Sequence, residues 1–187
     1  MDYISVGADG AVCGVKNNTA VRLNPWNMEF YPLPDSPKLN VISVGHAAKI
    51  WGVGTNGYPY KYRIDGRWKP RGTRKIYRLS VGADGGVWAI EENSNNILQW
   101  QSEANDWKVM NPPEGLSKPK LVSTASKTRV MIIDNSHKAW SYVQTSENDG
   151  NWTVTNDSPS DQYSTLIKLD QDITKILFEK YDKILGG

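Results

Sequence analysis

The chain has 187 residues, of which 39% are hydrophobic and 22% are charged, and its formal net charge is +2. These values are those of an ordinary globular protein, so they exclude a disordered chain and imply no nucleic-acid partner. The lone cysteine, Cys13, excludes an intramolecular disulfide, and no apolar stretch suits a signal peptide or a membrane span. We expect a cytoplasmic protein, or one secreted by a non-classical route.

The first predicted strands recur at a regular spacing. They cover residues 4–7, 42–45 and 79–82, whose starts lie 38 and 37 residues apart. A turn and a second strand follow each of them, at residues 11–15, 49–53 and 86–90, with apolar residues at alternate positions. A period near 40 residues with several short strands is typical of propeller blades, because a ring of sheets buries faces that one sheet leaves exposed.

Third strands are expected at residues 20–23, 60–63 and 97–100, each followed by a closing tryptophan at Trp26, Trp68 or Trp107. A fourth copy is weaker but keeps the same order, at residues 121–123, 129–133 and 138–142 with Trp152. Prolines separate the copies, and proline cannot occupy a central strand. These prolines therefore mark the crossovers between blades.

The turns at residues 8–10 and 83–85 both have the sequence Ala-Asp-Gly. Asp and Gly adopt positive φ at low cost, so both segments predict tight hairpin turns. Turn formation explains Asp9 and Asp84 without a metal. Calcium ligation by the same aspartates is the alternative, although the second copy has His46, Ala47 and Ala48 in this place. We expect no cofactor and no metal site.

The predicted fold is a single all-β domain over residues 1–187, a β-propeller of four-stranded antiparallel blades. The repeats lie approximately at residues 3–38, 39–75, 76–117, 118–158 and 163–187. We favour five blades, the last incomplete, because that number matches the length at the observed spacing. Four blades and a C-terminal helix are the alternative, because Leu166, Leu169 and Ile173 fall largely on one helical face.

Residues 5–15, 43–53 and 80–90 follow the pattern Ser-Val-Gly-x-Asp-Gly-x-Val-Trp-Gly-Val, which resembles the tectonin repeat family. That family includes slime-mould tectonins, fungal and fish-egg lectins and a horseshoe-crab lectin. The resemblance implies a β-propeller that recognises glycans or lipopolysaccharide, as in innate defence. Two departures matter. Cys13 and Met131 replace the second-strand tryptophan, and the usual six repeats exceed the four or five here, so the ring is smaller or a partner completes it.

Binding sites derived from a repeat are expected once per blade, where tryptophan or tyrosine stacks on a sugar ring and polar groups orient its hydroxyls. Strand packing or turn stabilisation is the alternative role for each candidate. Trp51 and Trp88 lie inside the repeat motif, so we expect them to pack between blades. The candidate carbohydrate-binding residues lie in the second turns and third strands: Asn17, Asn18, Asn56, Tyr58, Tyr60, Tyr62, Asn95, Asn96, Trp100, His137, Trp140 and Tyr142.

Catalysis finds little support in the sequence. The two histidines, His46 and His137, lie in no catalytic motif, and the adjacent acids Glu91 and Glu92 are explained as solvated charges. We expect a lectin-like module without enzymatic activity, whose shallow sites bind glycans or glycoconjugates through multivalency. The alternative is a platform for proteins or phosphoinositides, which the basic residues within 63–75 favour. An incomplete last blade would also allow a homo-oligomer.

Overall fold

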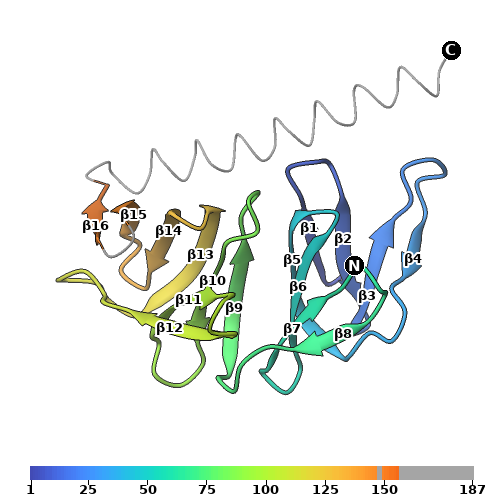
Figure 1. The fold of residues 1–187 in the computed structure, drawn as a ribbon, viewed down its shortest axis with the longest axis horizontal. Coiled ribbons are helices and arrows are strands. Elements are labelled where there is room, and N and C mark those ends of the chain that lie inside the picture. The colour runs from blue at the N-terminus through green and yellow to red at the C-terminus, as the bar shows by residue number, and fades with distance from the viewer. Residues whose placement is uncertain (147–148, 156–187) are drawn as a thin grey trace, which may run out of the picture. The chain divides into compact units, whose positions relative to one another are not determined.

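The computed structural model describes residues 1–146 and 149–155, within which Met1–Val154 form one compact unit. This part of the chain contains sixteen β-strands and no helix. The strands form four separate sheets of four, and each sheet keeps its strands in chain order (Figure 1). All neighbouring strands are antiparallel, so the predicted propeller blades are confirmed. The fifth repeat and its helical alternative lie outside the described residues, and the single-domain boundaries remain a prediction.

We number the sheets as blades 1 to 4, and in each the first strand is innermost. Blade 1 consists of β1 (Tyr3–Val6), β2 (Val12–Lys16), β3 (Thr19–Leu23) and β4 (Phe30–Pro32). Blade 2 consists of β5 (Leu39–His46), β6 (Lys49–Gly54), β7 (Pro59–Tyr62) and β8 (Trp68–Pro70). Blade 3 consists of β9 (Ile76–Val81), β10 (Val87–Glu91), β11 (Ile97–Gln101) and β12 (Asp106–Met110). Blade 4 consists of β13 (Pro119–Ser126), β14 (Arg129–Asp134), β15 (Ala139–Ser146) and β16 (Asp149–Val154).

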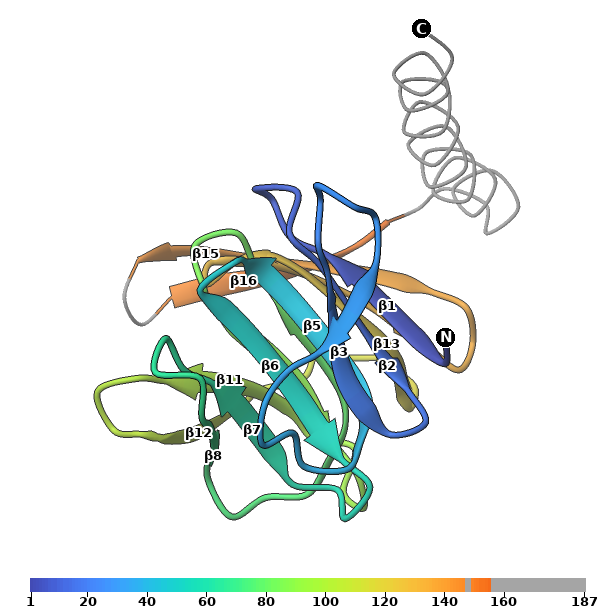
Figure 2. The same cartoon turned by 90° about the vertical axis from the view of Figure 1, so that its right-hand side faces the viewer.

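Consecutive blades pack face to face. The first strands β1, β5, β9 and β13 contact one another in that order, and each second strand contacts the first strand of the next blade. Figures 1 and 2 show this stacking of sheets from two directions. One apolar core lies at each junction, between blades 1 and 2, 2 and 3, and 3 and 4. Burial between blades therefore stabilises sheets that could not bury both faces alone.

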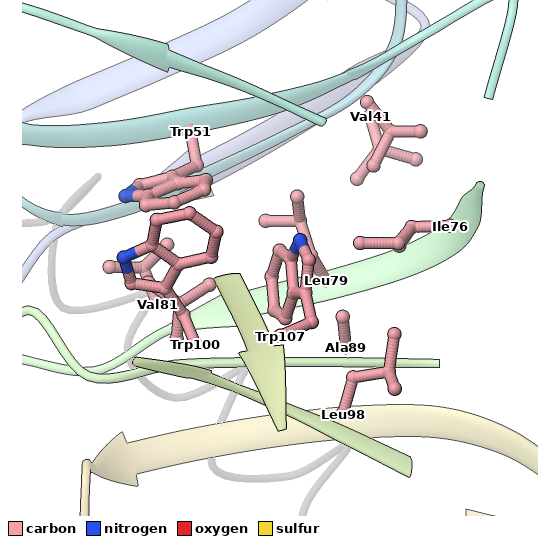
Figure 3. Close-up of a cluster of buried hydrophobic side chains, with 11 residues drawn as sticks. Val41, Trp51, Ile76, Leu79, Val81, Ala89, Leu98, Trp100 and Trp107 are labelled. Atoms are coloured by element: carbon pink, nitrogen blue, oxygen red, sulfur yellow. The ribbon is translucent and has the colours of Figure 1, made fainter. Parts of the chain in front are cut away.

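The core between blades 2 and 3 contains three tryptophans, shown in Figure 3. The Trp51 ring lies 5.3 Å from that of Trp100 and 6.0 Å from that of Trp107, and all three pairs meet edge to face. Edge-to-face pairs add to the burial of large apolar rings. Trp51 and Trp88 are both buried, which confirms the expected packing role of the second-strand tryptophans.

The closing aromatic residue of each blade lies opposite a third-strand residue. Trp68 pairs with Tyr62, Trp107 with Trp100, and Trp152 with Tyr142. The prediction for blade 1 is wrong, because Trp26 lies in the turn between β3 and β4 with 93% of its surface exposed. Hydrogen bonds from Met28 N to Asn24 O and from Asn24 N to Glu29 O close this turn, so β4 begins only at Phe30. Phe30 occupies the closing position instead, because it pairs with Leu23, the third-strand residue that aligns with Tyr62.

The repeated serine of the first strand joins one blade to the next in blades 1, 2 and 3. Its hydroxyl oxygen accepts a hydrogen bond from a backbone N–H on the following inner strand. We call this the serine contact, and it occurs from Val44 N to Ser5 at 3.0 Å, from Val81 N to Ser43 at 3.0 Å and from Thr124 N to Ser80 at 2.9 Å. The serine in the repeat is therefore a structural link between blades.

Asp9 and Asp84 also join neighbouring blades. The Asp9 carboxylate accepts a hydrogen bond from Ala47 N, and the Asp84 carboxylate accepts one from Lys127 N, both at 2.8 Å. Each aspartate also accepts a bond within its own turn, from Ala11 N and Gly86 N respectively. These backbone contacts account for the aspartates in the repeat.

Candidate functional site

Three of the predicted binding residues lie in packing positions. Trp100 belongs to the tryptophan cluster of Figure 3, and Tyr142 packs between the rings of Trp88 and Trp152. The indole of Trp140 donates a hydrogen bond to buried Asp134. All three side chains are buried, so they offer no open ring face to a ligand.

The predicted residues of blade 2 come together around the turn between β6 and β7. The Asn56 amide donates to the Tyr60 hydroxyl at 3.1 Å, and its oxygen accepts from Tyr58 N at 3.1 Å. Tyr60 and Tyr62 are half-buried against the core between blades 1 and 2. Both faces of blade 2 are covered by neighbouring blades, which explains why its third-strand tyrosines are half-buried.

The remaining predicted residues lie in the turns after the second strands. All four turns have positive φ at one equivalent residue, namely Asn18, Gly57, Asn95 or His137. Asn17 and His137 are exposed in their turns. The Asn18 side chain donates to Leu39 O at 3.0 Å, so it links blades 1 and 2.

These turns are tied to the next blade through their carbonyl groups. Asn18 O accepts a hydrogen bond from Leu39 N, and Gly57 O accepts one from Ile76 N, both at 2.8 Å. Leu39 and Ile76 each lie four residues before the repeated serine, and the residue in that place in blade 4 is Pro119. Proline has no N–H, so the carbonyl of Asn95 receives no such bond from it. The junction between blades 3 and 4 therefore differs from the two before it.

A cavity of about 270 Å³ lies at this junction. We call it the Asn95 cavity, and it is lined by Ser94, Asn95, Asn96, Ile97, Met110, Pro112, Leu116, Ser117, Lys118 and Pro119. The side-chain oxygen Oδ1 of Asn95 is buried and has no hydrogen-bond partner among the described residues. Buried polar atoms are nearly always hydrogen-bonded, so this oxygen is an exception among the described residues.

Glu91 holds the turn that forms one side of the cavity. Its carboxylate accepts hydrogen bonds from the Asn96 amide at 2.8 Å, from the Ser94 hydroxyl and from Arg74 at 2.8 Å. Burial of this carboxyl opposes ionisation, but the bonds from Ser94, Arg74 and Asn96 outweigh it and lower the pKa of Glu91. The Asn96 side chain is thus held by Glu91. The side-chain oxygen of the neighbouring Asn95 has no partner among the described residues.

The sequence identified Asn95 and Asn96 but missed the opposite wall. Ser117 and Lys118 provide polar groups there, and Met110 and Leu116 provide apolar surface. The only available signal was Pro119, which occupies the place of Leu39 and Ile76 in the aligned repeats. The sequence alone does not show that the N–H groups of Leu39 and Ile76 bind the preceding turns, so the effect of proline at this position becomes clear only from the structure.

A second cavity, of about 200 Å³, lies between blades 2 and 3. Its lining includes Asn40, Thr55, Tyr77, Arg78 and Glu92. Both cavities lie at the edge where the first strands begin and the second strands end. Successive blade junctions on this edge thus carry polar cavities of similar size.

The described residues contain no group of three or more His, Cys, Asp or Glu side chains that could hold a metal ion. No helix in this part of the chain is long and apolar enough to cross a membrane. In the basic segment, Arg63 pairs with Asp65 at 3.2 Å and Arg74 pairs with Glu91 at 2.8 Å. These pairs reduce the positive charge that this segment presents to an anionic partner.

Comparison with known proteins gives a family and a fold. The family model described as Tectonin domain matches residues 1–172, and no curated protein matches the chain. Virginiamycin B lyase from Staphylococcus aureus is 15% identical with a TM-score of 0.59, over 84% of this chain and 56% of that chain. YCF48 bound to D1 peptide is 11% identical with a TM-score of 0.60, over 83% and 53%.

The Cps50 (Swd1) β-propeller domain of Myceliophteria thermophila is 7% identical with a TM-score of 0.59, over 83% of this chain and 58% of that chain. Similarity at these identities shows the fold alone. The chain spans just over half the length of these solved structures.

Proposed function

This chain belongs to the tectonin family of β-propeller binding modules, and we propose that it binds carbohydrate, without catalysis, in the Asn95 cavity. The observation that carries the proposal is the buried, unpartnered Oδ1 atom of Asn95 in a cavity between two blades. A polar atom in this state gains the most from a ligand hydroxyl, because leaving it without a partner costs free energy.

The lining of the cavity suits the two surfaces of a sugar ring. Ring hydroxyls both donate and accept hydrogen bonds, and the Asn95 amide offers an acceptor and a donor while Lys118 offers a charged donor. Ile97, Met110 and Leu116 form an apolar wall for the C–H groups of the ring. No aromatic side chain lines this cavity, so the support comes from aliphatic contact and hydrogen bonding.

The size of the cavity favours a small ligand. Ligand cavities commonly have volumes of roughly 300–1,000 Å³, and the Asn95 cavity has about 270 Å³. One terminal monosaccharide unit therefore suits it better than an internal oligosaccharide segment. Single shallow sites of this kind bind weakly, and linked sites gain roughly two to four orders of magnitude through multivalency.

A glycan array with matched variants tests the proposal. Asn95 has φ 58°, a conformation that glycine adopts without strain, so Asn95→Gly removes the amide and preserves the turn. We expect this variant to lose glycan binding about tenfold or more, since two hydrogen bonds of roughly 1 kcal/mol each are removed. Asn17→Gly is the control, because Asn17 has φ 50° and lies in an exposed turn away from the cavity.

Two outcomes would contradict the proposal. One is binding to no glycan together with a thermal-shift response that simple sugars leave flat. The other is glycan binding that Asn95→Gly retains in full, which would place the site elsewhere on the propeller.

A further inference from the structure

The two end blades expose positions that are buried in the middle of the row. Residues 4–7 and 42–45 have the same sequence, Ile-Ser-Val-Gly. Ile42 and Val44 are 0% and 3% exposed, whereas Ile4 and Val6 are 57% and 55% exposed. The difference arises because the corresponding face of blade 2 packs against blade 1, while no described blade precedes blade 1. We call this surface, with Val12 beside it, the leading face.

Blade 4 exposes the side that, in blades 1 to 3, packs against the next blade. In blade 2 the forward side, represented by Val41 and Trp51, is buried against blade 3. In blade 4 the aligned residues are Leu121 and Met131, of which Leu121 is 42% exposed and Met131 is half-buried. Val143, on the same side, is 37% exposed. We call this surface the trailing face. Among the described residues no extensive contact joins β1 to β13, and blades 1 and 4 end the row (Figure 1).

The two faces also carry the two halves of a serine contact. Ser123 follows Ser5, Ser43 and Ser80 in the repeat, and its hydroxyl makes no hydrogen bond with any described residue. The matching donor is Val6 N–H. Gly7 N bonds to Ala11 O, so by the alternation of an antiparallel ladder the Val6–Val12 pair is not hydrogen-bonded and Val6 N–H points away from β2. An acceptor at one end thus matches a donor at the other.

We propose that a second copy of this chain covers both faces. The leading face of each copy packs on the trailing face of the other, and Ser123 accepts a hydrogen bond from the partner's Val6 N–H. Such a dimer has a two-fold axis and two identical junctions, so it closes without leaving a free end. It would contain eight described blades, which lies within the usual range of four to eight.

Three observations favour a second copy over other occupants. Each exposed face has its repeat-derived complement on the same chain. The chain spans 56% and 58% of the lengths of two solved propeller-like structures, so the described blades alone fall short of a propeller of that length. The net charge of +2 causes little electrostatic repulsion between two copies.

One contact between blades would be missing from the new junction. Lys127 occupies the place of Asp9 and Asp84 in blade 4, so no carboxylate is available there to accept a backbone N–H from the next blade. The junction between blades 2 and 3 packs tightly without this carboxylate, since Ala47 is in the same place in blade 2.

The mass of the full chain in solution is the first test. We expect sedimentation equilibrium to give twice the 21.0 kDa of one chain. Ile4→Asp should shift the chain to monomer at concentrations where the wild type is dimeric, since it places a charge in the junction. Ile64→Asp is the matched control, because Ile64 is highly exposed in the turn between β7 and β8 and should leave the dimer intact.

A mixing experiment tests the geometry. Val6→Cys and Ser123→Cys chains are combined and treated with a short bismaleimide. We expect a cross-linked dimer from the mixture and none from either variant alone, because two copies of residue 6 lie at different junctions. Native Cys13 does not interfere, since it is buried and burial raises the pKa of its thiol to about 11.

Several results would overturn the proposal. A monomeric wild type is one of them. In that case the leading and trailing faces would be covered by another part of the chain or by a different protein. Cross-linking within the Val6→Cys variant alone is another, because it would require a different pairing of the ends. A dimer unchanged by Ile4→Asp, with no cross-link in the mixture, would place the interface elsewhere. Sugar binding does not enter these measurements.

Discussion

The indole Nε1 of Trp140 donates a hydrogen bond to the carboxylate of Asp134 at 3.0 Å. The same carboxylate accepts backbone N–H groups from Ser136 at 2.8 Å, Lys138 at 3.0 Å and Ser117 at 3.2 Å. Asp134 is buried, and Ser117 belongs to the segment that leads into blade 4. One charged group thus fixes a turn, a tryptophan and the start of a blade.

Asp134→Asn is expected to destabilise the chain, since an amide cannot accept all four bonds. We expect the free energy of unfolding to fall by about 2–4 kcal/mol at pH 7, measured by urea denaturation. The exposed Asp35 makes no side-chain hydrogen bond with any described residue, so Asp35→Asn should change stability by less than about 0.5 kcal/mol. An equal effect of the two variants would contradict the role of Asp134.

The effect of Asp134 should also depend on pH. Burial opposes ionisation of this carboxyl, but the bonds from Trp140, Lys138, Ser117 and Ser136 outweigh it and lower its pKa below 3.8. A lowered pKa stabilises the folded state above the pKa of the unfolded chain, and this contribution disappears as pH falls through the folded-state value. The difference between wild type and Asp134→Asn should therefore narrow below about pH 4. A difference that stays constant down to pH 2 would contradict the assignment.

Trp100→Ala tests the packing role of a third-strand tryptophan. It opens a cavity in the core of Figure 3 and should lower the free energy of unfolding by about 3–5 kcal/mol. Ligand affinity per folded molecule should stay unchanged. Trp26→Ala removes the same side chain from an exposed turn and should change stability by less than about 0.5 kcal/mol. Lost ligand binding in a stable Trp100→Ala variant would instead assign Trp100 to a site.

Gly45→Ala tests the close approach of two blades. A Cβ atom on Gly45 would overlap the backbone carbonyl oxygen of Gly82 in blade 3, and backbone atoms cannot move aside cheaply. We expect a loss of about 3 kcal/mol or more. Gly66→Ala is the comparison, because its nearest atoms are 3.8 Å away and only its φ of 78° opposes a side chain, at about 1 kcal/mol. Urea denaturation should show a larger loss of unfolding free energy for Gly45→Ala than for Gly66→Ala. An equal or reversed order would contradict the close approach of the two blades.

Cys13 should be chemically inert in the folded chain. Burial raises the pKa of its thiol to about 11, so the reactive thiolate is rare at neutral pH. A colourimetric thiol reagent at pH 8 should react slowly with the native protein and quickly after denaturation. Reaction at the rate of a free thiol under native conditions would show that the junction between blades 1 and 2 opens readily.

Much of the architecture was predictable because it depends on local pattern. Alternating apolar residues and a spacing of 37 or 38 residues located the strands of blades 1 to 3. The prediction failed at Trp26, where hydrogen bonds between Asn24, Met28 and Glu29 extend the turn and leave Phe30 in the closing position. The spacing of the repeats does not predict the length of that turn, because the hydrogen bonds that close it depend on backbone geometry.

The candidate site was predictable only in part. Asn95 stood out as a turn residue, but the opposite wall of the cavity beside it includes Pro119, which lies 24 residues further along the chain. The missing N–H of Pro119 matters because the equivalent N–H groups of Leu39 and Ile76 bind the preceding turns. The aromatic candidates Trp100, Trp140 and Tyr142 looked suitable for stacking on sugars, but neighbouring groups bury them.

By itself, the sequence determined the repeating unit, the strand order within a blade and the positions that favour burial. These follow from periodicity and turn chemistry, which act over a few residues. Only the tertiary structure decided which copies of one motif are covered. Ile4 and Ile42 occupy the same place in identical tetrapeptides, yet one is exposed and the other buried. Burial depends on whether another blade packs there, and that is a property of the assembled blades.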